Sequence, residues 1–324
     1  MISPSALATF EKDRDEYYLK YLSEPKPERS PQSEPASVGS AFDARVKANL
    51  MADLLGVHCG ETHDALFESQ VEPHNRDFAL NAGLHCFNSY LHCGAYRDLA
   101  TMMEDAQEEP QFEFNADVTI DGIPLFGKPD ARFVDANGNH IVLDWKVNGY
   151  CGKANTSPAK GYALCRDGLG YPKPSRSHGK SHKLYKPRDH NGVEINDFNL
   201  EHISIDWADQ LTMYGWMMGE TPGDEIIVCI DQITGKGIEG SNPALRIANH
   251  RATVSKDYQL NLVKRLKDMW GRVQSGQIFE GSAEKCAEIC RRLDNVAVAV
   301  QSDGTAQGDF LAQCFRGSSI YRAR

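Results

Sequence analysis

The spacing of apolar residues changes near residue 110, and this change predicts the order of the elements. Before it, helical spacing predominates. A helix that we expect to begin near Val38 carries bulky apolar residues every four positions on one face, at Phe42, Val46 and Leu50. Residues 75–107 indicate further helix. The segment 1–110 is therefore expected to be an N-terminal helical part.

A first helix is predicted at the N-terminus itself. Ser3 suits the N-cap position and Pro4 suits the first helical position. Bulky residues continue to about Tyr21, where we expect this helix to end. The polar, proline-rich stretch that follows, SEPKPERSPQSEPAS, is typical of a loop.

From Gln111 the period of the apolar residues changes, which indicates consecutive strands. Two dipeptides, Asp121-Gly122 and Asn137-Gly138, are strong signals for tight turns between antiparallel strands. We therefore expect two hairpins in succession, the second of which joins strands on either side of Asn137-Gly138.

Later segments repeat both patterns. We expect, in order, a helix, two strands and an amphipathic helix, within residues 207–218, 224–233, 242–255 and 256–276. This order predicts an α+β protein with a mixed central sheet flanked by helices. We expect one compact domain overall, with a core over residues 111–280 and a helical tail over residues 281–324.

The charge is distributed unevenly. The chain has a formal net charge of −10, which by itself argues against nucleic acid as a partner. Residues 151–190 reverse the balance, because nine basic residues against two acidic ones give +7 and leave −17 for the rest. This Gly-, Ser- and Pro-rich segment has no apolar period and is predicted to be a long loop. It is either a solvated insertion or a basic arm that binds phosphates through Lys153, Lys173, Arg176, Lys180, Lys183, Lys186 and Arg188.

Composition also indicates the cellular compartment in which the protein is expected. No run of eighteen apolar residues occurs, and the first residues have neither the basic stretch nor the apolar core of an export signal. The nine cysteines are an odd number without regular spacing. We therefore expect a cytoplasmic protein with reduced thiols and no membrane partner.

Two acids and a lysine lie close together in the stretch GKPDARFVDANGNHIVLDWK, residues 127–146. Side chains alternate along a strand, so Asp144 and Lys146 share one face while Trp145 points to the other, toward the core. A tight hairpin brings Asp130 beside Asp144. Paired carboxylates repel unless a cation lies between them, and their oxygens suit Mg²⁺ or Mn²⁺. The alternative is a surface hairpin held by salt bridges.

Neighbouring motifs make this pattern more specific. Pro129-Asp130 followed by Asp144-Trp145-Lys146 resembles the signature of the PD-(D/E)XK nuclease superfamily, and the chain is similar to its RecB-like exonuclease branch, which includes CRISPR-adaptation and phage-encoded nucleases. Further stretches match motifs of that branch in the same order: SPSALATFEKDRDEYYLKYL, VGSAFDARV, the Gly-x-x-Asp strand at Gly127 and DQLTMYGWMM. The resemblance covers residues 3 to about 218 and implies the restriction-endonuclease-like fold of that superfamily.

The resemblance implies a role for each residue of the central signature. Asp130 and Asp144 are implied metal ligands, and Trp145 contributes its backbone carbonyl. Lys146 is the implied catalytic amine, a point charge that orients the attacking hydroxide and neutralises the charge developing on the phosphate.

Four further positions match the branch in part. Asp43 stands where the family has a histidine that reaches the metal; it is either a ligand suited to Mg²⁺ or an acid that only stabilises its helix. Gln210 and Tyr214 share a helix face and are implied to contact DNA phosphate or to support Lys146, with ordinary packing as the alternative for Tyr214. Glu113 matches a strand position where the family often has an acid, and is otherwise an exposed strand residue.

The sequence departs from the branch in its cysteines. Many members hold an iron–sulfur cluster, but here Asp13 takes the place of the first cysteine and the three late cysteines lack suitable spacing. We expect no cluster. A second group, His85, Cys86, His92 and Cys93, invites a zinc interpretation, but without a close Cys-x-x-Cys pair these are expected to be buried helix residues.

These features predict a DNA nuclease that depends on Mg²⁺ or Mn²⁺, an exonuclease or end-processing enzyme of phage or bacterial recombination, repair or replication. Its expected partners are single-stranded DNA or duplex ends, together with a phage or host recombination protein, in the cytosol of a bacterium or a phage-infected host. The alternative is an inactive nuclease-fold protein that binds nucleic acid or a protein, and the intact acids and lysine argue against it. A structural phage protein without metal would require the hairpin match to be coincidence.

Overall fold

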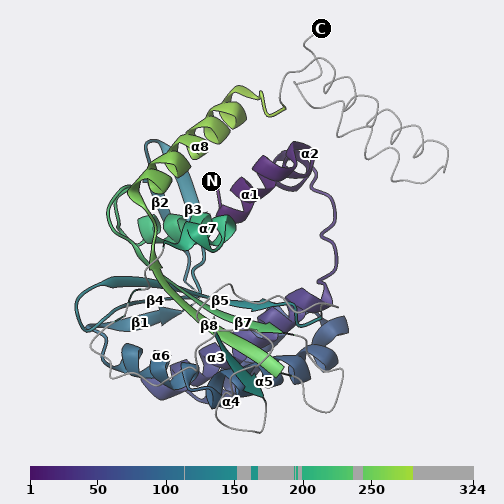
Figure 1. Cartoon of the computed structure of the whole chain (residues 1–324). Helices are drawn as coiled ribbons and strands as arrows, with labels where there is room; N and C mark the ends of the chain where they lie inside the picture. Colours follow the sequence, from purple (N-terminus) through teal and green to yellow (C-terminus); the bar gives the residue numbers. More distant parts are fainter. Residues whose placement is uncertain are drawn as a thin grey trace, which may run out of the picture. The chain divides into compact units, whose positions relative to one another are not determined.

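The computed structural model describes residues 1–112, 114–151, 193, 195, 199–235 and 244–279, together with the backbone of 162–166. The chain forms two compact units (Figure 1). The terminal unit comprises Met1–Arg29, Thr119–Leu125 and the chain from Asn261 onward, and the sheet unit comprises Ser30–Val118 and Phe126–Leu260. Within the described part of the chain, no helix is both long and apolar enough to cross a membrane.

The longest helix of the sheet unit is α3 (Glu34–Leu55). Its buried face carries Phe42, Val46 and Leu50, as predicted. The predicted start near Val38 is wrong by one turn, because Pro35 suits the first turn of a helix and lets it begin at Glu34.

Three more helices follow α3. They are α4 (Cys59–Gln70), α5 (Arg76–His92) and α6 (Ala95–Glu104), with a short 3₁₀ turn, η2 (Pro73–Asn75), before α5. The predicted helix over 75–107 is confirmed as two helices, separated where Gly94 adopts a left-handed φ of 94°. The helix α4 was absent from the prediction.

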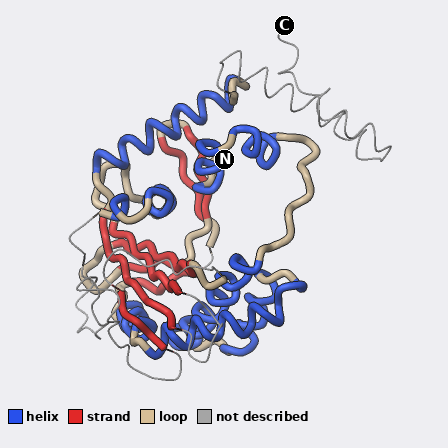
Figure 2. The backbone as a smooth tube through the Cα atoms, turned by 45° about the vertical axis from the view of Figure 1, so that its right-hand side comes forward, coloured by secondary structure: helices blue, strands red, loops and turns tan. Residues whose placement is uncertain are grey.

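A six-stranded mixed sheet forms the centre of the sheet unit. Its strand order is β1-β4-β5-β7-β8-β6, in which only the β5–β7 pair is parallel. The strand bounds are Glu108–Phe112 for β1, Ala131–Val134 for β4, His140–Asn148 for β5, Ile227–Gly235 for β7, Ala244–Thr253 for β8 and Tyr162–Arg166 for β6. The predicted mixed sheet flanked by helices is therefore present (Figure 2).

The strand β6 corrects one prediction. Residues 151–190 were expected to be a loop throughout, yet residues 162–166 form a strand that pairs with β8. The sequence of this segment shows no apolar period, and pairing with an existing edge supplies the backbone hydrogen bonds that sequence alone cannot reveal.

Helices cover both faces of this sheet (Figure 1). The helices α3, α5 and α6 pack on one face, where Phe42, Tyr90 and Leu99 meet Phe133 and Trp145 in the main apolar core. The other face carries α7 (Ile205–Met217), preceded by the 3₁₀ turn η4 (Leu200–His202). Because side chains alternate along β5, the two faces receive different residues of the same strand.

The core also contains a buried polar network. Asp231 on β7 pairs with Arg251 at 2.6 Å and accepts hydrogen bonds from Tyr90 and from Asn249, the latter at 2.7 Å. The side chain of Asp231 is fully buried. Burial and the charge of Asp231 raise the pKa of Tyr90 well above its ordinary value, so its hydroxyl keeps its proton and remains a donor.

The terminal unit begins with a broken helix. Instead of one helix to about Tyr21, the chain forms α1 (Pro4–Lys12), α2 (Arg14–Tyr17) and a π-helical turn η1 (Tyr18–Leu22). The break falls at Asp13, whose extended backbone lets its carboxylate cap α2 by accepting from Asp15 N and Glu16 N. Ser3 caps α1 as predicted. The competing cap at Asp13 explains why one predicted helix became two.

The remaining elements are a hairpin and a long helix. The strands β2 (Ala116–Ile120) and β3 (Ile123–Gly127) form a separate two-stranded sheet, and their turn has positive φ at Asp121 and Gly122, as the Asp-Gly signal predicts. The last described helix, α8 (Lys256–Ser275), confirms the predicted amphipathic helix and buries Leu262, Leu266 and Met269.

Candidate active site

The hairpin β4–β5 places the two predicted acids next to each other. Its register pairs Ala131 with Leu143, so that Asp130 and Asp144 are the next residues on the two strands. The turn is closed by Asp135, whose Oδ1 accepts from Asn137 N at 2.9 Å and Asn139 N at 2.8 Å. The hairpin predicted from Asn137-Gly138 is therefore confirmed.

Asp130 is fixed against the backbone of β5. Its Oδ2 accepts a hydrogen bond of 3.0 Å from Trp145 N, the amide that directly follows Asp144. The Trp145 side chain points to the opposite face and lies in the apolar core, as predicted. The carboxylate of Asp130 is therefore bound to the backbone of β5 at the residue that follows Asp144.

Asp144 is buried and Lys146 is partly buried, and they form an ion pair with 2.5 Å between Asp144 Oδ2 and Lys146 Nζ. Burial, followed by the negative charge of Asp130, raises the pKa of Asp144 to about 7 against the opposing effect of Lys146. Burial by itself would lower the pKa of Lys146, but the charges of Asp144 and Asp130 outweigh it and raise that pKa. The charge of Asp130 therefore affects the protonation of Asp144, and Lys146 keeps its positive charge.

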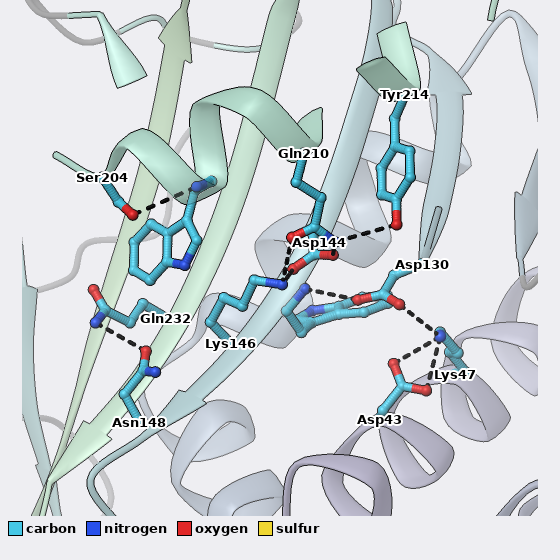
Figure 3. Close-up of polar contacts among 12 residues, drawn as sticks. Asp43, Lys47, Asp130, Asp144, Lys146, Asn148, Ser204, Gln210, Tyr214 and Gln232 are labelled. Atoms are coloured by element: carbon cyan, nitrogen blue, oxygen red, sulfur yellow. Dashed lines mark hydrogen bonds and ion pairs between the residues drawn. The ribbon is translucent and has the colours of Figure 1, made fainter. Parts of the chain in front are cut away.

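The helix α7 supplies the residues that hold this pair (Figure 3). Gln210 Nε2 donates to Asp144 Oδ1 at 3.0 Å, and Gln210 Oε1 accepts from Lys146 Nζ at 3.0 Å. The same Nε2 donates to the hydroxyl of Tyr214 at 3.2 Å. One amide thus binds both members of the ion pair, which supports the interpretation of Gln210 as a residue that supports Lys146.

The start of α7 has its own cap. Ser204 Oγ accepts from Trp207 N at 3.4 Å and caps the helix, which begins at Ile205, five residues before Gln210. Because Gln210 and Tyr214 are four residues apart, they project from one face of the helix, and that face meets β5.

A glycine makes room for Tyr214. A Cβ atom added at Gly127, the last residue of β3, would lie 2.4 Å from Tyr214 Cε1 and 3.0 Å from Met217 Sδ. Such distances are far below van der Waals contact, so only glycine lets the ring lie where its hydroxyl reaches Gln210. The glycine of the Gly-x-x-Asp motif therefore has a packing role here.

Gly127→Ala is expected to lower the free energy of unfolding by about 1–3 kcal/mol, because the added methyl group overpacks the ring of Tyr214. Denaturant unfolding measures the loss. Gly39→Ala in α3 is the matched control, since a Cβ there meets nothing within 4 Å and alanine favours a helix. Equal stability of the two variants would contradict the close approach of Tyr214.

Asp43 and Lys47 face the other side of Asp130. They lie one turn apart on α3, and Lys47 Nζ is 2.7 Å from the Asp43 carboxylate and 3.2 Å from Asp130 Oδ1. The structure thus brings Asp43 to the same cluster as Asp130, with an ammonium group between them. Ligation of a metal by Asp43 stays a prediction.

Lys47 was missed in the sequence. Its signal was present as an Asp–Lys pair at i and i+4 on a helix whose neighbouring residues, Val46 and Ala48, are apolar. Such pairs are common on exposed helices, and only the burial of this one distinguishes it.

A second polar row lies beside Lys146 on the same face of the sheet. Gln232 on β7 pairs in register with Lys146, and its amide donates to Asn148 Oδ1 at 3.2 Å (Figure 3). Its Oε1 lies 3.0 Å from His250 Nε2. Burial, then the charge of Arg251, lowers the pKa of His250 to about 4, so this histidine is neutral at neutral pH. Polar groups therefore continue from the ion pair across β5, β7 and β8.

The donor set fits a divalent ion of the Mg²⁺ type. Among the described residues, no three His, Cys, Asp or Glu side chains gather closely enough to hold an ion by themselves. Two neighbouring carboxylates nevertheless match the way Mg²⁺ is bound through few protein oxygens, with water and substrate phosphate completing its shell. Burial, and then the charge of Asp130, raises the pKa of Asp144, and a cation beside both carboxylates would oppose that rise.

Some predicted residues lie outside the described part of the chain. These are Glu113, Cys286, Cys290, Cys314 and the side chains of the basic segment, namely Lys153, Lys173, Arg176, Lys180, Lys183, Lys186 and Arg188. The residues considered for zinc lie within the described part of the chain, and they differ in exposure to solvent. His85, Cys86 and Cys93 are buried, as expected for core helix residues, whereas His92 is exposed.

Comparison with known proteins gives little. No family model matches the sequence, and no curated protein matches it. A solved structure described as "Crystal structure of SSO0001" is similar over 81% of this chain and 85% of that chain, at 13% sequence identity and a TM-score of 0.25. A likeness this weak carries no argument about fold or function, so any functional conclusion depends on the site itself.

Proposed function

We propose that this protein is a divalent-metal-dependent DNA nuclease with the PD-(D/E)XK fold, of the RecB-like branch, that trims or processes DNA ends in recombination, repair or replication. The observation that supports it most is the convergence of Asp130, Asp144 and Lys146 with Gln210 and Tyr214. These residues come from the hairpin β4–β5 and from α7, and more than sixty positions separate Lys146 from Gln210. A surface hairpin held by salt bridges would not need a glutamine from a distant helix that binds both members of the ion pair.

Each residue has a task in phosphodiester hydrolysis. Asp130, Asp144 and the carbonyl of Trp145 would hold the ion, which when bound activates a water molecule and stabilises negative charge on the phosphate. Lys146 places a positive charge beside the position of the attacking oxygen and neutralises charge as it develops. Gln210 fixes the ammonium and the carboxylate relative to each other, so little reorganisation is needed during the reaction. Tyr214 orients the Gln210 amide.

The charge distribution supports a nucleic-acid substrate. The segment 151–190 carries +7 in a chain of −10, and it follows Lys146 within five residues in the sequence. A positive segment this close to Lys146 in the sequence would bind the phosphate backbone irrespective of base sequence. The enzyme would then act on DNA of any sequence, which suits end processing.

Cleavage of end-labelled DNA tests this function. The full-length protein should degrade single-stranded DNA, duplex DNA or both in Mg²⁺ or Mn²⁺, and EDTA should abolish the reaction, because the ion supplies the activated water. Adding the metal back in excess over EDTA is the control for recovery. Binding of DNA without cleavage in either metal would favour the inactive nuclease-fold alternative, and neither binding nor cleavage would reject the nuclease interpretation.

A further inference from the structure

Lys47 is a buried lysine between two carboxylates. Its side chain has 0% exposure, which is rare for lysine unless the charge is paired. The ammonium lies 2.7 Å from Asp43 and 3.2 Å from Asp130, and its Nζ is 5.7 Å from the centre of the Trp145 ring (Figure 3). A cation is therefore already built into this side of the site.

We propose that Lys47 is a positioning residue that takes the place of a metal ion between Asp43 and Asp130, so that the site binds a single divalent ion, on its Asp144 side. Two carboxylates on either side of one cation form the arrangement that a bridging ion would require. A divalent ion brought beside a fixed ammonium would be repelled by it strongly in this buried setting. Asp43 then holds Lys47 and does not ligate metal.

The formal charges agree with one ion. The cluster has a charge of −1 when all its groups are ionised, because it holds three carboxylates and two ammonium groups: Asp43, Asp130, Asp144, Lys47 and Lys146. One divalent ion brings the cluster to +1, whereas two would bring it to +3 in a largely buried site. A net charge of +3 would be costly in free energy because these groups are largely shielded from water. The inference rests on the proposed function only for the ion at Asp144.

The variant Lys47→Met tests this role, because methionine keeps much of the unbranched side chain and removes the charge. In EDTA, Asp43 and Asp130 then lose the ammonium that lies between them, and the unfolding temperature should fall below that of the wild type. The charge-balanced variant Asp43→Asn with Lys47→Met should recover most of the loss. In Mn²⁺, Lys47→Met should gain a second ion between the two carboxylates.

Calorimetric titration of the full-length proteins with Mn²⁺ gives the stoichiometry. The wild type is expected to bind one ion, and Asp144→Asn should weaken it by more than the roughly 10–100-fold typical of lost outer-shell groups. Lys47→Met should bind two ions. The combination Lys47→Met with Asp144→Asn should keep the new ion, because its ligands are Asp43 and Asp130.

The outcomes separate the two proposals. No Mn²⁺ bound by the wild type would count against the proposed function, yet an ion gained by the combined variant would still support the role of Lys47. The role of Lys47 is overturned if Lys47→Met binds no more Mn²⁺ than the wild type and the combined variant binds no more than Asp144→Asn. Should Lys47→Met be unfolded in EDTA, recovery of the fold by Mn²⁺ or by Asp43→Asn supports the role, and failure of both overturns it.

Discussion

Lys146→Met is expected to reduce Mg²⁺-dependent DNA cleavage by about 10²–10³-fold, the usual cost of removing one group that stabilises developing charge in a transition state. Methionine retains most of the side-chain length but cannot neutralise the phosphate. The ammonium contacts both Asp144 and Gln210, so the variant also releases the groups that hold it. Initial rates on end-labelled DNA, measured over a range of Mg²⁺ concentrations, give the size of the loss.

Two comparisons make this result specific. Asp144→Asn should lose cleavage together with metal binding, whereas Lys146→Met should lose cleavage and keep the ion, because it removes no ligand. The control is Lys267→Met in α8, which removes an exposed lysine that pairs with Asp121 at 2.7 Å. Its rate should stay within about twofold of the wild type, since exposed ion pairs contribute little. Wild-type cleavage by Lys146→Met would exclude this lysine from the chemistry.

Asp231→Ala is expected to lower the free energy of unfolding by about 3–5 kcal/mol, the cost of leaving a buried charge without its partner. Arg251 is almost fully buried and pairs with Asp231 at 2.6 Å, and Tyr90 and Asn249 donate to the same carboxylate. Removing the acid takes away the acceptor that these three donors share. Chemical denaturation followed by circular dichroism measures the change.

The matched control for Asp231 is Glu108→Ala, in the same unit. Glu108 pairs with Arg132 at 3.1 Å on the surface, so its loss should cost less than about 1 kcal/mol. The combination Asp231→Asn with Arg251→Met removes both buried charges and should recover part of the stability lost in Asp231→Ala. A loss of only about 1 kcal/mol in Asp231→Ala would mean that water or rearrangement replaces the network.

Local patterns in the sequence were enough to predict most of the elements near the site. The Asn137-Gly138 turn between two apolar stretches predicted the hairpin, and hence the pairing of Asp130 with Asp144. The spacing of Gln210 and Tyr214 predicted a shared helix face. These features depend on neighbours within a few residues, so no knowledge of distant contacts was needed.

Other features depended on competition between local signals. The expected first helix is broken because Asp13 caps α2, and α3 begins a turn earlier than expected because Pro35 is favourable in a first turn. The strand β6 forms because an unpaired edge of β8 is available to it. In each case the residues concerned could be identified in the sequence. Their effect depended on which of two local backbone conformations formed more hydrogen bonds.

The sequence by itself determined that Asp144 and Lys146 share a strand face opposite Trp145, because the period of a strand is two residues. Only the tertiary structure decided what those groups touch. It brings Gln210 onto the ion pair from α7 and inserts Lys47 of α3 between Asp43 and Asp130. The physical reason is that burial sets the strength of the interaction between two charges. An Asp–Lys pair one helical turn apart contributes little when it faces water, and the same pair inside the protein fixes where another cation can bind.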